Sequence, residues 1–404
     1  MTSTLSDGDL LHVKAVREVL GSDGSVIPID LDTDFNLLRW HENFDGDLTV
    51  IKRHFTDYVR SRKAAGFDRP DHVENFQELQ SFKRVMPLVS HSKLDELSLS
   101  KRHSAVVMFE KGIAQHYHLI RTVKTSEYML LCFAYMEYLL QLILRLEKRT
   151  GKRHWAMTVL DIHSVNILNY INPLAPHVRA WALRQQIWEM FYPKMIAKVF
   201  VVNGSGLLGI FWQAVRLMVG EKHRHLIEFV SHQKLHEHLE LGVLPPAYGG
   251  TLVNTSGWGE MSDCCHVRKH LTDSDHYDAD SVWSGHNMKR PKWTKLTVHP
   301  NETQIVTQKV ENSDKQQSLI YQYWLHGDAY VEVLRRNSES DDADEQTSSN
   351  EIVYLSLPLI TTKVPEDGVL EDIPSGDYEL RFTNRSHYFN LKVDYAVAAV
   401  AQGS

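Results

Sequence analysis

The sequence has few cysteines and no excess of positive charge, and both features narrow the class of protein. Its 404 residues include three cysteines, too few for a disulfide framework, so we expect reduced thiols and a cytosolic setting. The formal net charge is −7, which argues against a nucleic-acid partner. The first residues are partly acidic and lack an apolar run of signal-peptide length, so no secretory signal is expected.

Familiar catalytic and metal-binding motifs are also missing. The chain has no G-x-S-x-G nucleophile elbow, no phosphate loop of the G-x-x-x-x-G-K-[ST] type and no H-E-x-x-H pair. We therefore predict no enzymatic activity, no cofactor and no metal site, and leave open whether the segment 254–290 binds a metal. Its cysteines are adjacent, which does not match zinc spacing. The candidate ligands considered are His232, His236 and His238, and Cys264, Cys265, His266 and His270.

One apolar stretch, 129–146, has the length of a short membrane span. Glu137, Gln141 and Arg145 recur in it at four-residue intervals and so share one face of a helix. A helix with a narrow polar stripe and apolar flanks is typical of a core helix that covers a sheet. We predict that role rather than a membrane span.

The rest of the chain divides by its patterning. Helical periodicity comes first, then strand-like runs alternating with helices, which predicts a mainly parallel α/β sheet. A segment rich in Ser, Asp, His and Gly follows, and after it only short strands with turn signals, which predict an antiparallel β-sandwich. The predicted division is a helical region at 1–80, an α/β domain at 81–253, a linker at 254–290 and a sandwich at 291–400.

A glycine pattern supplies the main alternative. Gly204, Gly206 and Gly209 fit the dinucleotide-binding G-x-G-x-x-G sequence after a strand, and Glu228 lies near the spacing of a ribose-binding acid. The pattern sits at the last crossover of the α/β region, whereas a dinucleotide site uses the first. Two alternative functions are therefore kept beside the main one given below. They are an NAD(P)-dependent oxidoreductase and a non-lipid scaffold in membrane trafficking.

Several ordered motifs resemble the CRAL-TRIO lipid-binding family followed by a GOLD domain. The first part is carried by FNLLRWHENF at 35–44, YP at 192–193 with KVFVVN at 198–203, and LPPAYGG at 244–250. The second part is carried by VPEDGV at 364–369, GDYELRFTNRS at 376–386 and KVDY at 392–395. This order of domains resembles the supernatant protein factor, or tocopherol-associated, type.

The resemblance implies a non-catalytic protein that binds and transfers or presents a hydrophobic lipid. It implies a helix that opens as a gate at membranes, and a GOLD domain that docks to membranes or membrane proteins such as those of the Golgi. The protein would then be cytoplasmic with peripheral membrane association. In phosphatidylinositol-binding relatives, polar side chains occupy positions that here are Lys194, His223 and Leu226. The ligand expected is therefore mainly apolar or neutral, or a phospholipid held chiefly by its tails.

The predicted lipid pocket combines a sheet floor with an apolar lid at 207–220. The lid residues recur at helical spacing, and glycines flank them as hinges. The floor is assigned to Val107, Phe109, Met157, Val159, Phe200 and Val202. The lid is assigned to Leu207, Leu208, Phe211, Val215 and Met218, with hinges at Gly204, Gly206, Gly209 and Gly220.

Overall fold

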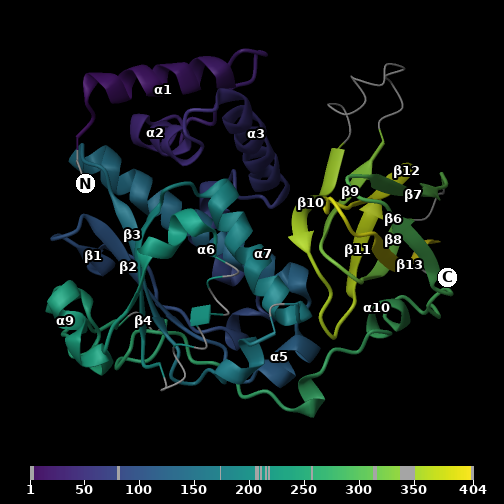
Figure 1. Ribbon diagram of the computed structural model, residues 1–404. Helices are drawn as coiled ribbons and strands as arrows, with labels where there is room; N and C mark the ends of the chain where they lie inside the picture. The colour runs from purple at the N-terminus through teal and green to yellow at the C-terminus, as the bar shows by residue number, and fades with distance from the viewer. Residues whose placement is uncertain are drawn as a thin grey trace.

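The computed structural model describes residues 4–79, 82–172, 174–204, 209, 212–213, 216, 219–255, 258–312, 316–336 and 351–401, with side chains except at 351–357. An N-terminal group of helices lies on an α/β layer, and a β-sandwich stands beside both (Figure 1). The predicted fold class is confirmed.

Three of the four N-terminal helices begin at polar capping residues. Ser6, Thr33 and Asp47 each accept a hydrogen bond from a backbone N–H of the helix that follows, which satisfies donors left free in the first turn. Their apolar faces meet around Trp40 and Tyr58, both fully buried. The helices are α1 (Asp7–Leu20), α2 (Asp34–Asn43), α3 (Leu48–Ala64) and α4 (Pro70–Glu74).

The α/β layer contains a five-stranded sheet in the order β1-β2-β3-β4-β5, parallel except for β1. Its strands are β1 (Leu99–Ser100), β2 (Ala105–Lys111), β3 (Trp155–Asp161), β4 (Ile196–Val202) and β5 (Ile227–Phe229). The helices are α5 (His116–Thr122), α6 (Thr125–Thr150), α7 (Pro176–Phe191) and α9 (Leu235–His238). Helix α6 is the apolar stretch noted above, and 72% of its most apolar window is buried, so its predicted role as a core helix is confirmed.

The sandwich consists of two four-stranded antiparallel sheets, β10-β9-β12-β7 and β11-β8-β13-β6. Alternate residues of β12, Tyr378, Leu380 and Phe382, point into its core and are fully buried, as the period of a strand requires. The strands are β6 (Thr294–Val298), β7 (Thr303–Val310), β8 (Gln317–Leu325), β9 (Ala329–Arg335), β10 (Glu351–Leu359), β11 (Glu366–Ile373), β12 (Gly376–Thr383) and β13 (Leu391–Ala401).

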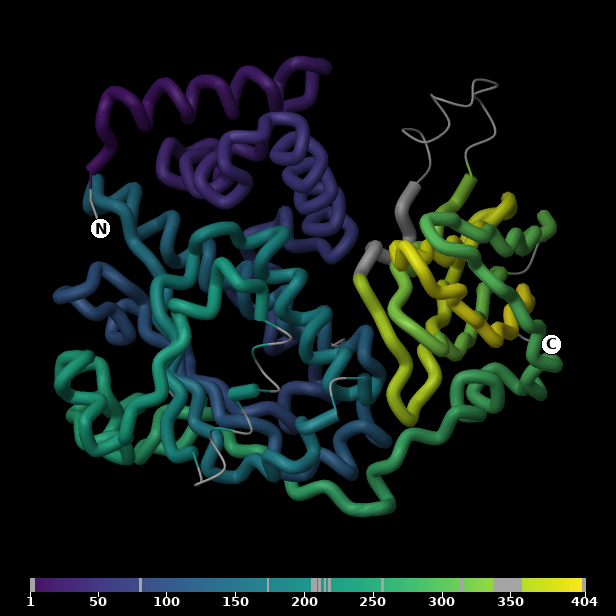
Figure 2. Tube along the Cα trace, in the orientation of Figure 1, coloured from purple at the N-terminus to yellow at the C-terminus, as the bar shows by residue number. Residues whose placement is uncertain are grey.

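The segment 254–290, predicted to be a linker, packs against both parts that it joins. Cys264 and Cys265 are buried, and the backbone N–H of His266 donates to the carbonyl of His91 at 3.0 Å. Further along, Trp283 of α10 (Ser281–Ser284) is buried and donates to the side chain of Gln322 in the sandwich. Figure 2 shows this connector running from the α/β layer to the sandwich. The segment joins the two parts and also packs on both, because an irregular sequence can still bury apolar side chains.

The sandwich contacts the α/β layer directly as well. Lys124 Nζ lies 2.8 Å from Asp367 Oδ1, and the Thr362 hydroxyl donates to the carbonyl of Ile120 at 3.1 Å. Arg179 of α7 pairs with Asp328 before β9. These polar contacts join the two parts in addition to the connector.

Candidate functional site

A cavity of about 380 Å³ lies between the five-stranded sheet and α7. That volume is within the range of about 300–1,000 Å³ typical of small-molecule sites. Its apolar lining comes from β3, β4 and β5 on one side and from α7 on the other. The sheet residues that line it are Glu110, Trp155, Thr158, Leu160, Ile196, Val199, Val201, Ile227 and Phe229.

The facing wall is one face of α7. Trp181, Arg184, Gln185, Trp188 and Glu189 line the cavity, and their positions follow the spacing of a single helical face. The helix has a proline in its first turn, where the missing N–H costs nothing. It ends just before the Tyr-Pro step at 192–193, because a proline cannot continue a helix. Two tryptophans therefore face the apolar side of the sheet.

A buried ion pair forms part of the cavity wall. The guanidinium of Arg184 donates two hydrogen bonds of 2.7 Å to the carboxylate of Glu110, and one of 2.9 Å to the Tyr128 hydroxyl. Burial alone would raise the pKa of Glu110, but the adjacent guanidinium outweighs it and leaves that pKa below its usual value. The pair therefore stays charged inside a mainly apolar wall.

Several buried polar atoms of the lining residues have no hydrogen-bond partner among the residues that the structure describes. Among them are Thr158 Oγ1, Arg184 Nε and Trp188 Nε1. A buried polar group without a partner is costly, so such atoms usually meet water or a ligand. The cavity can therefore accept a molecule with a polar atom as well as hydrocarbon.

Basic side chains gather where the cavity meets α2 and the turn after residue 219. Arg153 makes two hydrogen bonds, 2.8 and 2.7 Å long, to Glu42, and His223 Nδ1 lies 2.9 Å from Glu189 Oε1. Lys194 lines the same region and is exposed. An amphipathic ligand could place its polar end here and its apolar end between the sheet and α7.

The sheet and this cavity coincide with a known domain. The model of the CRAL/TRIO domain family matches residues 103–250, which include β2 to β5 and α7. A CRAL-TRIO domain-containing protein of Caenorhabditis elegans is 32% identical over 404 residues, covering 98% of this chain and 97% of that protein. The chain belongs to the CRAL-TRIO domain family.

Two more distant similarities concern only part of the chain. A phosphatidylinositol/phosphatidylcholine transfer protein of Arabidopsis thaliana is 22% identical over 259 residues, covering 60% of this chain and 39% of that protein. Among solved structures, the crystal structure of Sfh5 aligns with a TM-score of 0.41 and 13% identity, covering 61% of this chain and 88% of that chain.

The floor predicted from sequence lies on the opposite face of the CRAL-TRIO sheet from the cavity. All six of its residues belong to a cluster that packs against Leu235 and Leu239 at α9 and against Tyr248, and none lines the cavity. They are Val107, Phe109, Met157, Val159, Phe200 and Val202. Both faces of a covered sheet are apolar, so alternation alone does not tell which face carries a cavity. The tryptophan-bearing face of α7 was also missed, although its helical spacing is legible in the sequence.

Most of the predicted lid lies outside the described residues, namely Gly206, Leu207, Leu208, Phe211, Val215 and Met218. Three of the four predicted hinges, Gly204, Gly209 and Gly220, are described. Val219, next to the last hinge, lines the cavity, and the Trp212 ring lies 5.5 Å from that of Phe229, another lining residue.

Glu228, the ribose-binding acid of the dinucleotide alternative, is paired with basic side chains of this chain. Glu228 Oε2 lies 2.9 Å from Lys198 Nζ, and its other oxygen lies 3.9 Å from Nδ1 of His238 in α9. The hydrogen bond from Lys198 holds the pKa of Glu228 below its usual value. The carboxylate thus faces α9, on the side of the sheet away from the cavity.

Neither group of metal-ligand candidates named from the sequence forms a cluster of three ligand atoms in the described part of the chain. Cys264 Sγ donates to the carbonyl of Leu252, and Cys265 packs with the residues that cover the far side of the sheet. One other group does meet that criterion among the described residues, and it consists of His118, Asp273 and His276.

Proposed function

We propose that the protein binds an amphipathic lipid in the cavity between the sheet and α7, and transfers or presents it without covalent chemistry. The observation that carries this is an apolar cavity of about 380 Å³ with basic side chains at one end. The similarity to a phosphatidylinositol/phosphatidylcholine transfer protein supports the same class of ligand. Transfer needs only a dry site and a membrane that competes for the tail, at about 0.8 kcal/mol per buried methylene.

The proposed ligand is held chiefly by its hydrocarbon. Lys194 and Leu226, which replace polar residues expected for an inositol phosphate, both line the cavity. Leu226 cannot donate a hydrogen bond to a phosphate, and the ammonium of Lys194 cannot accept a hydrogen bond from an inositol hydroxyl. We therefore propose a neutral lipid, or a phospholipid whose headgroup contributes little, and expect slow vesicle-to-vesicle transfer of phosphatidylinositol.

We also propose that residues 207–220 act as the gate of this cavity. Support comes from Val219 in the lining and from the contact between Trp212 and Phe229. Hydrogen exchange tests the proposal, because the segment should exchange faster than α6 and faster still when membranes are added. Protection equal to that of α6 in both conditions would contradict it.

Replacement of a lining residue by a larger one tests the cavity itself. Val199→Trp should fill the space between β4 and α7, so native mass spectrometry and lipid extraction of the purified protein should find much less bound lipid. The matched control, Ile305→Trp, adds the same side chain at an exposed position of β7 and should leave bound lipid unchanged. Equal lipid in both folded variants would place the lipid elsewhere.

For the sandwich we propose a GOLD-like role in docking to membranes or membrane proteins, including those of the Golgi. Tyr388 and Phe389, before β13, are 85% and 77% exposed, and such aromatic side chains favour the membrane–water interface. The double replacement of both by serine should weaken sedimentation with lipid vesicles. The control is Ile305→Ser, and equal sedimentation of both variants would exclude this loop as the contact.

A further inference from the structure

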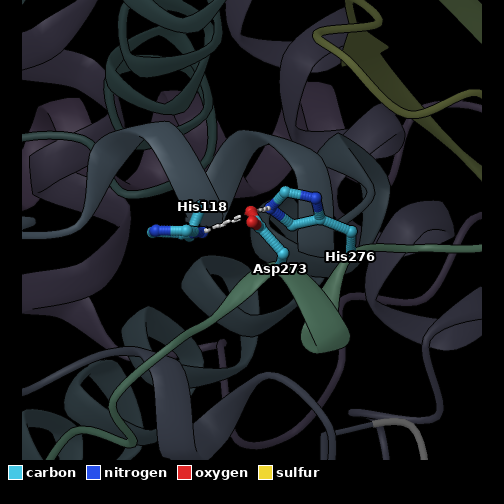
Figure 3. Close-up of side chains that lie close together, drawn as sticks. All are labelled: His118, Asp273 and His276. Carbon is cyan, nitrogen blue, oxygen red and sulfur yellow. Dashed lines mark hydrogen bonds and ion pairs between the residues drawn. The ribbon is translucent and has the colours of Figure 1, made fainter.

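Three side chains, one of them far in the sequence from the other two, converge where the connector crosses α5. His118 Nδ1 lies 3.2 Å from His276 Nε2, and one oxygen of Asp273 lies 3.8 Å from the former and 3.6 Å from the latter. Figure 3 shows the carboxylate of Asp273 and the two imidazole rings directed toward one another. The cluster is separate from the lipid cavity, which it does not line.

Local structure sets the positions of these groups before any ion arrives. Asp273 and His276 lie at either end of a single 3-10 turn, in which residues three apart fall on the same side. Thr272 and Asp275 form a capping box that fixes the turn, and the N–H of His276 donates to the carbonyl of Asp273 at 3.2 Å. His118 comes from the helix α5 that faces this turn.

The spacing of the ligand atoms matches a tetrahedral metal ion. Bonds of about 2.0–2.2 Å to nitrogen and oxygen place the donors of tetrahedral zinc about 3.3–3.6 Å apart. The three separations here, 3.2 to 3.8 Å, bracket that value. We propose that His118, Asp273 and His276 bind Zn²⁺ or a similar divalent transition metal ion, with water as the fourth ligand.

The donor types support this class of ion. Two imidazoles and one carboxylate suit zinc, whereas Ca²⁺ and Mg²⁺ prefer sites made of oxygen. Asp273 is 85% exposed, which leaves an open side for a water ligand and for entry of the ion. Asp275, two residues from Asp273, already pairs with Lys269, so it does not compete for the ion.

A bound ion would fasten the connector beside a contact between the two domains. The residue after His276 is Tyr277, whose N–H donates to the carbonyl of Arg121 at 2.7 Å and whose hydroxyl donates to Asp367 in β11. An ion that binds the folded chain and not the unfolded chain would stabilise this arrangement by mass action. The site would therefore tie α5 to the connector, next to the contact that Tyr277 makes with the sandwich.

The test uses the full chain after removal of metal with a chelator, titrated with Zn²⁺ by calorimetry. We expect one site that His118→Gln and Asp273→Asn each weaken at least tenfold. The control His270→Gln, which removes an exposed histidine of the same connector, should bind as the unaltered chain does. Absence of saturable binding, or equal affinity in all four proteins, would overturn the proposal.

A second measurement covers the case in which a variant fails to fold. Co²⁺ added to the unaltered chain should give the visible absorption of a tetrahedral ion, and Zn²⁺ should displace it. Zn²⁺ should also slow protease cleavage within 254–290. A spectrum of hydrated octahedral Co²⁺ alone would count against the site.

Discussion

Glu366 of the sandwich accepts a hydrogen bond of 3.1 Å from the backbone N–H of Ser126, in the first turn of α6. A side chain from one domain thus caps the longest helix of the other. The carboxyl group is fully buried, and its second oxygen has no partner among the described residues. Burial raises its pKa to about 7. The VPEDG motif therefore contributes to the domain junction.

The first prediction is that Glu366→Gln removes a pH dependence of stability. The folded chain retains the proton of Glu366 up to about pH 7, while the unfolded chain releases it near 4.5, so stability falls as pH rises through that interval. The shift corresponds to a loss on the order of 3 kcal/mol. Urea unfolding at pH 5 and pH 8 measures this. From pH 5 to pH 8, the free energy of unfolding of the variant should rise relative to that of the unaltered chain. Glu371→Gln, exposed on the same strand, is the control, and a pH-independent difference for Glu366→Gln would contradict the prediction.

The second prediction concerns the polar stripe of α6. Glu137 is fully buried and accepts hydrogen bonds from Tyr58 Oη at 2.7 Å and Arg62 Nε at 2.9 Å. Arg62→Met leaves that carboxylate without its cation, so we expect a loss of about 3–5 kcal/mol in the free energy of unfolding. Arg145→Met breaks a half-exposed pair on the same helix and should cost less than about 1 kcal/mol. Denaturant unfolding of the two variants measures both losses. Similar losses would contradict the prediction that burial decides how much each ion pair contributes to stability.

The third prediction places the end of the CRAL-TRIO domain beyond residue 253. The backbone of His266 bonds to Ser90 and His91, and Cys265 fills part of the far side of the sheet. A chain truncated after residue 277 should fold alone and be more stable than one ending at 253 by about 2–5 kcal/mol, through buried apolar groups and hydrogen bonds. Urea midpoints of both chains test it. Equal midpoints would mean that the connector only rests on the surface.

The fourth prediction is that NAD and NADP do not bind. Glu228 is engaged by Lys198 on the side of the sheet away from the cavity, so it is not available for a ribose hydroxyl. Calorimetric titration of the full chain with either cofactor should give no heat at micromolar concentrations, with a known dehydrogenase as the positive control. A saturable titration would favour the oxidoreductase alternative.

Local patterning predicted most of the elements because each is set by residues close in sequence. Four-residue recurrence of polar groups marked α6, and short apolar runs marked β2, β3 and β4. No apolar run in the sequence predicted the strands β1, β7 and β11. In β7, exposed and half-buried residues alternate, and only the last residue is buried. The strand therefore lacks the run of apolar side chains that marks a strand in a sequence. Irregular segments such as the connector carry no period at all.

By itself, then, the sequence determined the order and class of the elements and, through its motifs, the family. Only the tertiary structure decided which face of the sheet carries the cavity, because Val159 and Leu160 are both apolar and alternation does not rank two covered faces. It also decided that His118 meets His276 and that Glu366 meets Ser126. Such contacts join residues more than a hundred positions apart, and they depend on how the elements pack rather than on any local preference of the chain.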